Sequence, residues 1–202
     1  MKRIVNSLFA SIVLLLMLHP AQAQYTPLYA MRQINAQRND QSRFIDVVRH
    51  FYTANWTEAV NANRFYGYYF TGTVANGWSG SGSALKPVYR LYRPATDARY
   101  YTSDWNQQQY LISYAGFVSE GIAFYVSTYQ RPGTYPLYRV DRNYSPAQYF
   151  MWWQTAPEVP ETHMLTLRYS DVRAATQSYG FTTNQNFGSL LGYAYPGNLG
   201  VD

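Results

Sequence analysis

Three segments of the chain share one pattern of turn and aromatic residues, and this self-similarity constrains the fold more than any other feature of the sequence. Each segment opens with proline, an aliphatic residue and tyrosine, as in Pro87-Val88-Tyr89. The same interval then separates Phe51 from Gly67, Tyr100 from Gly116 and Met164 from Gly180. Such a period is typical of folds assembled from copies of one supersecondary unit. We therefore expect three repeats, at about 25–78, 86–127 and 135–196, packed into a single domain over residues 24–202.

Within each copy, the residue pattern predicts strands joined by turns. Residues 88–92 and 122–126 are rich in β-branched and aromatic side chains and are bounded by turn residues, which is typical of strands. The first and third copies carry extra residues after the opening strand, at 33–46 and 141–161, and we expect these insertions to be loops.

A short helix is predicted between the second and third strands of each copy. Asn55 stands three residues before Glu58, and Asp104 stands three residues before Gln107 at the same position of the repeat. This spacing is typical of a helix N-terminus, because the two side chains can satisfy free N–H groups of the first turn. In the third copy, Arg168 takes the capping position.

The expected fold class is mainly β with short helices, in three pseudo-symmetric repeats. We expect a β-trefoil-like closed arrangement, with a three-bladed propeller or prism-like arrangement as the alternative. Closure is favoured because units with open strand edges would pair with other chains and aggregate. The chain has no cysteine, so packing alone must hold the fold, and an aromatic share of 18% against 13% charged residues favours a large ordered core.

The N-terminus has the three parts of a cleavable signal peptide. Lys2 and Arg3 precede an apolar run over residues 8–18, which is followed by the small-x-small triplet Ala21-Gln22-Ala23. The apolar run is too short for a transmembrane helix, which needs about 20 residues. We therefore expect residues 1–23 to be removed and the protein to be secreted or periplasmic, with no transmembrane segment.

The sequence gives no sign of nucleic-acid, metal or cofactor sites. The arginines are scattered among tyrosines, which favours guanidinium groups packed on aromatic rings over a nucleic-acid surface. No His-Glu-x-x-His motif, cysteine pair or calcium-binding loop occurs, so no metal site and no cofactor are predicted. His50 and His163 lie at equivalent positions of two copies, which favours a structural role over catalysis.

The second copy carries three motifs of a known pattern, namely Pro87-Val88-Tyr89-Arg90-Leu91-Tyr92, Arg99-Tyr100-Tyr101-Thr102 and Glu120-Gly121-Ile122-Ala123-Phe124-Tyr125. It resembles an uncharacterised repeat family, a domain of unknown function in secreted bacterial and fungal proteins whose core reads Asp-His-Phe-Tyr-Thr-Thr. The resemblance is good over residues 87–126 and weaker in the outer copies. It implies an extracellular location and frequent attachment to extracellular hydrolases as an accessory module, and it supplies no activity. At the family's Asp-His positions this chain has Arg49-His50, Ala98-Arg99 and Thr162-His163.

An aromatic residue recurs just inside the predicted helix start of each copy, as Trp56, Trp105 and Tyr169. These rings could pack in the core or between repeats, because each can bury a large area. The functional alternative to this favoured packing role is a stacking platform for sugar rings, repeated three times to gain avidity. Together with His50 and His163 they are the candidate ligand-binding residues, and no catalytic residue is predicted.

Two charged residues predict an ion pair within the second copy. Arg90 and Glu120 occur together there, while the matching positions of the first copy are the uncharged Ala30 and Thr71. This joint loss predicts a pair that joins the first strand of the copy to its third strand, as part of the structure.

Two classes of function are compatible with the sequence. The first is a secreted, non-catalytic binding or structural module whose partner is a cell-wall polysaccharide, another glycan or a cell-envelope component. The second is a secreted hydrolase that uses the insertion at 158–163, where Glu158 and Glu161 stand near His163. The first class is favoured because no set of acid, base and nucleophile converges in the sequence.

Overall fold

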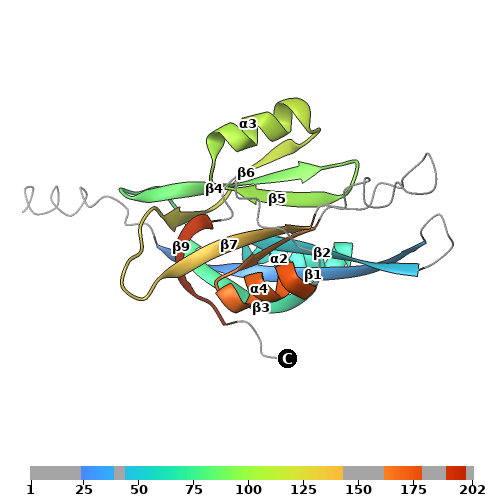
Figure 1. The fold of residues 1–202 in the computed structure, drawn as a ribbon, viewed down its shortest axis with the longest axis horizontal. Helices are drawn as coiled ribbons and strands as arrows, with labels where there is room; N and C mark the ends of the chain where they lie inside the picture. The colour runs from blue at the N-terminus through green and yellow to red at the C-terminus, as the bar shows by residue number, and fades with distance from the viewer. Residues whose placement is uncertain (1–23, 39–43, 143–161, 179–189, 199–202) are drawn as a thin grey trace, which may run out of the picture.

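The computed structural model describes residues 24–38, 44–142, 162–178 and 190–198. Within these ranges the order strand, strand, helix, strand occurs three times, and we name the three parts unit 1, unit 2 and unit 3 (Figure 1). Unit 1 consists of β1 (Tyr25–Arg38), β2 (Phe44–Thr53), α2 (Trp56–Tyr66) and β3 (Tyr69–Trp78). Unit 2 consists of β4 (Leu85–Arg93), β5 (Ala98–Thr102), α3 (Trp105–Tyr114) and β6 (Val118–Ser127). Unit 3 consists of β7 (Tyr135–Arg142), β8 (Thr162–Thr166), α4 (Tyr169–Ser178) and β9 (Leu190–Pro196).

All strand pairs are antiparallel, and the opening strand lies at the centre of each unit. Strand β1 pairs with β2 and β3, β4 pairs with β5 and β6, and β7 pairs with β8 and β9. The third strands then connect the units, through Trp78 opposite Tyr125, Ser127 opposite Tyr193, and Asn76 opposite Tyr195. The nine described strands therefore form one branched sheet.

Over the described residues this sheet is open, so the closed trefoil-like arrangement expected from the sequence is wrong, and so is the propeller. Closure was expected because it removes exposed edges. In the described sheet, β2, β5 and β8 each pair on one side only, but these three edge strands contact one another in the interior. Packing protects the edges, and closure is therefore not required.

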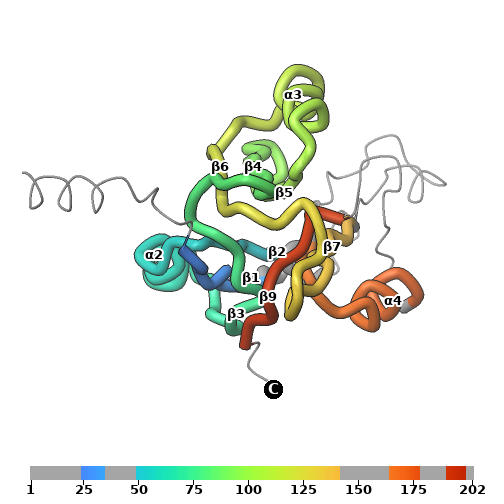
Figure 2. Tube along the Cα trace, turned by 90° about the vertical axis from the view of Figure 1, so that its left-hand side faces the viewer, coloured from blue at the N-terminus to red at the C-terminus, as the bar shows by residue number. Residues whose placement is uncertain are grey.

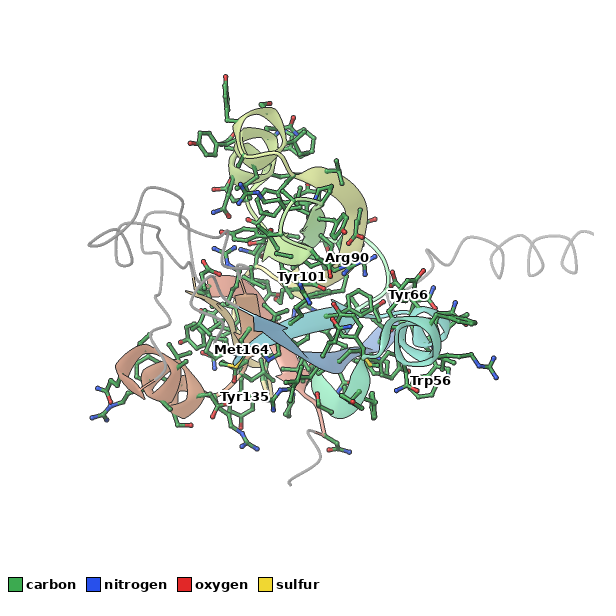
Figure 3. The ribbon with its side chains drawn as sticks, turned by 90° about the vertical axis from the view of Figure 1, so that its right-hand side faces the viewer. Trp56, Tyr66, Arg90, Tyr101, Tyr135 and Met164 are labelled. Carbon is green, nitrogen blue, oxygen red and sulfur yellow. The ribbon has the colours of Figure 1, made fainter. Side chains whose placement is uncertain are left out.

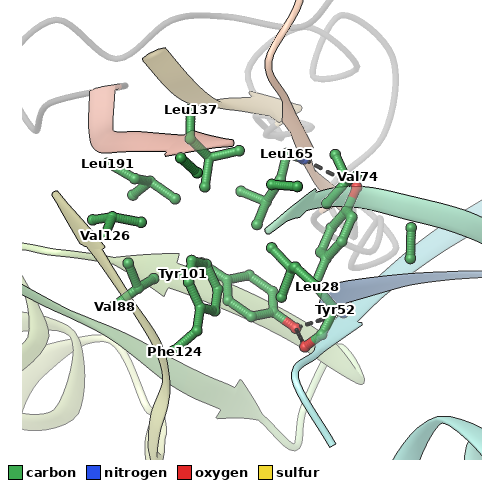
Figure 4. Packing of buried hydrophobic residues seen from close by; sticks show 13 residues of the cluster. Leu28, Tyr52, Val74, Val88, Tyr101, Phe124, Val126, Leu137, Leu165 and Leu191 are labelled. Atoms are coloured by element: carbon green, nitrogen blue, oxygen red, sulfur yellow. Dashed lines mark hydrogen bonds between the residues drawn. The ribbon is translucent and has the colours of Figure 1, made fainter. Parts of the chain in front are cut away.

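Tyrosine hydroxyl groups satisfy free backbone groups along these edges. The Tyr101 hydroxyl accepts from the backbone N–H of Tyr52 and donates to the carbonyl of the same residue, both at 2.8 Å (Figure 4). The Tyr52 hydroxyl in turn accepts from the backbone N–H of Leu165 at 3.0 Å. A side chain of one unit thus takes the place of a neighbouring strand on the edge of another unit.

The central core lies where the three units meet. Leu28, Val88 and Leu137 occupy the same position in the three opening strands and are at most 1% exposed. They pack in one cluster with Tyr52 and Tyr101, as Figure 4 shows. Because every unit contributes to this cluster, the core of each unit is incomplete without the other two.

A smaller apolar cluster lies under each helix. Met31 and Phe51 pack beneath α2, Leu91 and Phe117 pack with side chains of α3, and Val140 packs with Val172 and Ala175 of α4. Figure 2 shows the three helices at separate corners around the sheet. Each helix therefore buries one face on its own unit.

The sequence analysis predicted a loop at the first insertion, and this prediction is wrong. Strand β1 continues to Arg38 and β2 begins at Phe44, so most of residues 33–46 form a long hairpin in which Ile34 pairs with Val48. The β-branched residues Ile45, Val47 and Val48 favour this extended pairing. Residues 1–23 and 143–161, which contain the predicted signal peptide and most of the second insertion, lie outside the described residues.

Candidate functional site

Each helix begins with the same hydrogen-bonded arrangement, centred on the threonine that ends the preceding strand. In unit 1, Thr53 Oγ1 accepts from the backbone N–H of Asn55 at 3.0 Å and donates to the carboxylate of Glu58. The same two bonds join Thr102 to Asp104 (3.0 Å) and Gln107 (2.6 Å), and Thr166 to Arg168 (3.0 Å) and Asp171 (2.7 Å). The threonine thus fixes the orientation of a polar side chain in the first turn of every helix.

The predicted helix caps are confirmed, but their partners differ from a capping box. Asn55 Oδ1 accepts from the backbone N–H of Glu58, and Asp104 Oδ1 accepts from the backbone N–H groups of Asn106 and Gln107. The side chain of Glu58 does not return to the cap, because Thr53 satisfies the N–H of Asn55 instead. Its carboxylate is therefore available to a residue of the neighbouring unit.

The recurring aromatic residues are the first residues of the three helices and are largely exposed. Trp56 is 54% exposed, Trp105 56% and Tyr169 68%. Each packs against one tyrosine of its opening strand, with ring centroids 5.0 Å apart for Trp56 and Tyr29, 5.8 Å for Trp105 and Tyr89, and 6.2 Å for Tyr169 and Tyr138. We call these three ring pairs the helix-start platforms. The helix residue of each pair lies outside the buried core clusters, whereas Tyr29 and Tyr138 pack against the clusters of their own units.

The platform of unit 1 is larger than the other two. Phe70 of β3 lies with its ring centroid 5.9 Å from Trp56 and 6.2 Å from Tyr29, and it is 49% exposed. Three rings of unit 1 therefore form a continuous apolar surface beside the start of α2.

The two histidines lie on different elements from these platforms. His50 is on β2, half-buried, with its ring nearly parallel to that of Tyr52 at a centroid distance of 6.2 Å. His163 is on β8, where its backbone pairs with that of Asp141. The side chain of His163 lies outside the described residues, as do Glu158 and Glu161 of the hydrolase alternative.

A charged network joins units 1 and 2. Arg90 Nε donates to Glu120 Oε2 at 2.7 Å, so the two residues of the predicted pair are in contact. The same guanidinium donates to Glu58 at 2.6 and 3.0 Å, and Arg99 Nε donates to Glu120 at 3.2 Å. We call Glu58, Arg90, Arg99 and Glu120 the Arg90 network. Three of these residues belong to unit 2, and Glu58 comes from the first turn of α2 in unit 1.

The electrostatics of this network favour its charged form. Burial opposes ionisation of Glu58, but hydrogen bonds from Arg90 and Thr53 outweigh burial and hold the pKa of Glu58 below its usual value. Burial also opposes the charge of Arg90, while the hydrogen bond to Glu58 and the nearby negative charges raise the pKa of Arg90. The two groups are therefore an ion pair at neutral pH.

Sequence reasoning found only part of this network. Glu58 was assigned to a helix cap, and Arg99 was noted only because it replaces the family's histidine. The available signal was the arginine that follows the Pro-aliphatic-Tyr motif in units 2 and 3, where Arg90 and Arg139 each reach the first helical turn of the preceding unit.

A pocket with a volume of about 550 Å³ lies next to the Arg90 network, between units 1 and 2. Its aromatic lining consists of Phe51, Phe65, Tyr66, Tyr68 and Tyr92. Its charged lining consists of Glu58, Asp97 and Arg99. The Arg99 guanidinium carbon lies 5.0 Å from the ring centroid of Phe51 and 4.9 Å from that of Tyr92, so cation–π contacts position it at the pocket wall.

Asp97 lines the same pocket from the turn between β4 and β5. Its backbone has a φ of 51°, and its carboxylate accepts from the hydroxyl of Tyr92 at 3.2 Å. Arg49 Nε of unit 1 lies 3.4 Å from the same carboxylate. This contact is a second charged link across the junction of units 1 and 2.

Two searches of the described residues give negative results. No group of three or more His, Asp or Glu side chains lies close enough there to hold a metal ion. No helix in the same ranges is both long and apolar enough to cross a membrane.

Comparison with curated proteins gave no match, and comparison with solved structures gave none either. A protein-family match covers residues 45–186, which is most of the three units. The match agrees with the uncharacterised domain expected from the sequence, although it assigns no role to the repeated motifs. The chain belongs to the family described as domain of unknown function (DUF5648).

Proposed function

We propose that the protein is an exported, non-catalytic module that binds a cell-wall or other polysaccharide through its three helix-start platforms. The observation that supports this proposal is the exposure of Trp56, Trp105 and Tyr169, each more than half exposed and each backed by a strand tyrosine. An aromatic ring held at the surface in a fixed orientation can stack on the apolar face of a sugar ring.

Three platforms in one chain suit a repetitive ligand. A polysaccharide presents the same sugar ring many times, so a second and a third contact form at high effective concentration once the first has formed. Weak stacking at each platform then adds up to useful affinity. The largest platform, at unit 1, is expected to contribute most, because Phe70 extends its surface.

The lowered pKa of Glu58 suits a hydrogen-bond acceptor better than the protonated acid of a glycosidase. Glycosidases use a carboxylic acid that stays protonated together with a second, ionised carboxylate. Glu58 at the pocket has a lowered pKa and is therefore ionised, as a hydrogen-bond acceptor should be. The hydrolase alternative depends on residues 158–163 and is not tested by the described residues.

The proposal is tested by retention of the protein on insoluble polysaccharides such as cellulose, chitin and peptidoglycan. The triple variant Trp56→Ala, Trp105→Ala and Tyr169→Ala should lose at least about tenfold in affinity for the retained polysaccharide. Tyr114→Ala is the matched control, because Tyr114 is 79% exposed on α3 but lies outside the platforms. Equal retention of the triple variant and the wild type would exclude the platforms as the binding surface.

Export is tested separately by measuring the intact mass of the protein after its producing cells have exported it. We expect a mature chain that begins at Gln24. Recovery of the exported protein with residues 1–23 still attached would contradict the signal peptide.

A further inference from the structure

We propose that the pocket between units 1 and 2 is a second carbohydrate site, which binds one end of an uncharged oligosaccharide. This inference rests on the proposed function and deepens it by naming the ligand class and the residues that select it. The pocket volume of about 550 Å³ falls within the usual range for small-molecule sites.

The pocket is separate from the nearest platform. Figure 3 shows Tyr66 on the side of α2 nearer Arg90, and Trp56 on the side away from it. Tyr66 ends the helix, where Gly67 adopts a left-handed conformation with a φ of 69°. The Tyr66 carbonyl accepts from Gln33 Nε2 at 2.6 Å, so the helix end is fixed on the long hairpin of unit 1.

Exposed rings at the pocket rim can stack on a sugar. Phe65 is 66% exposed and Tyr66 is 67% exposed, and both line the pocket. Nothing in the described structure requires large aromatic residues side by side at a solvent-exposed helix end. A bound ligand would cover these two rings and so remove their apolar surface from water.

The polar wall offers hydrogen-bond partners for hydroxyl groups. Side chains of Glu58 and Asp97 are 37% and 49% exposed, and both line the pocket while each is bound to an arginine. Arg99 provides donors on the same wall. Ionised acceptors beside a guanidinium donor form strong, directional bonds with neighbouring sugar hydroxyls.

The charges around the pocket are balanced, which selects an uncharged ligand. The cations are Arg49, Arg90 and Arg99, and the anions are Glu58, Asp97 and Glu120. Each charge already has a partner of opposite sign within 3.4 Å. A charged sugar would add a charge beside six groups that are already paired with one another, whereas hydroxyl groups can bond to the pairs as they stand.

Unit 2 provides a matched control for the rim. Phe65 stands two residues before Gly67, and Tyr114 stands two residues before Gly116 at the same position of the repeat. Tyr114 is 79% exposed but does not line the pocket. Tyr114→Ala therefore removes an exposed ring near a helix end without touching the pocket.

The test is isothermal titration of the protein with cellohexaose, chitohexaose and the hexamer of galacturonic acid. We expect at least one neutral hexamer to bind, and the acidic hexamer to bind at least about tenfold more weakly. The double variant Phe65→Ala and Tyr66→Ala should weaken neutral binding by about tenfold or more, and Phe65→Ala alone by a smaller factor. Tyr114→Ala should match the wild type.

The possible failures are distinguishable. Unchanged neutral binding in the double variant would overturn the pocket and leave the platforms in place. Tighter binding of the acidic hexamer would overturn the assignment of an uncharged ligand. If neither the hexamers nor any insoluble polysaccharide bound to the wild type, the proposed function and the pocket would both be wrong.

Discussion

Two junctions of the molecule use an arginine at the same repeat position in different ways. Arg90 lies at the junction of units 1 and 2, and Arg139 lies at the junction of units 2 and 3. Arg90 reaches Glu58, a half-buried carboxylate of the preceding unit that itself lines the pocket. Arg139 reaches Gln107 and is completely buried. Glu58, the third residue of α2, lies at an open and polar junction between units 1 and 2. Gln107, the third residue of α3, lies at a closed junction between units 2 and 3.

The buried arginine has partners of its own. Arg139 Nε donates to Asp141 Oδ1 at 2.8 Å, and Nη1 donates to the backbone carbonyl of Tyr101 at 2.6 Å. Its guanidinium carbon also lies 4.1 Å from the ring centroid of Tyr100. Because Gln107 cannot neutralise the charge, Asp141 on the same strand does so. We infer that this junction serves stability, while the junction of units 1 and 2 serves binding.

The largest expected effect of a substitution is at the closed junction. Arg139→Ala leaves the Asp141 carboxylate buried without its arginine, and loss of one partner of such a pair costs about 3–5 kcal/mol. Urea unfolding should show this loss, and adding Asp141→Asn should recover part of it by removing the buried charge. If Arg139→Ala lowered the free energy of unfolding by less than Arg90→Ala does, the junction of units 2 and 3 would not be the stabilising one.

A smaller effect is expected at the open junction, from a double-mutant cycle on Arg90 and Glu120. Each alanine variant should destabilise the protein, and the double variant should cost less than the sum, with a coupling of about 1–3 kcal/mol. The coupling is limited because Arg99 also bonds Glu120 and can partly replace Arg90. Denaturant unfolding of all four proteins measures it. Strict additivity would show that the pair does not tie β4 to β6.

The smallest effect concerns pH. The pKa of Glu58 is lower in the folded protein than its ordinary value of 4.5, so the folded state binds this proton less readily than the unfolded state. The stability that Glu58 contributes is therefore present at neutral pH and is lost as the pH falls through 4.5 towards the folded pKa. Glu58→Gln should flatten the acid limb of a stability–pH profile. An unchanged slope below pH 4.5 would show that Glu58 is not held ionised.

The sequence predicted the local features of the fold better than its closure. Helix starts at Trp56 and Trp105 followed from capping residues, which act within a few positions of the chain. Closure was wrong because the edges are protected by a contact between distant units, the Tyr101 hydroxyl on the Tyr52 backbone. The spacing of residues in a sequence does not show that a tyrosine hydroxyl will satisfy the backbone groups of an edge strand.

The candidate site shows the same limit. The Arg90 and Glu120 pair could be inferred because both charges are present in the second copy and both are absent from the first. The bond from Arg90 to Glu58 could not, because it crosses between units and Glu58 already had a local explanation as part of a cap. The pocket depends on how two units meet and has no signature in either unit alone.

Hydrogen–deuterium exchange with and without a neutral hexasaccharide tests most directly whether one junction binds and the other stabilises. We expect added protection at residues 62–68, the end of α2, and at residues 92–98, the turn between β4 and β5, because both line the pocket. Residues 135–142 and 162–166 at the buried junction should be strongly protected without ligand and unchanged by it. Added protection confined to the buried junction, or none at either one, would contradict this division of roles.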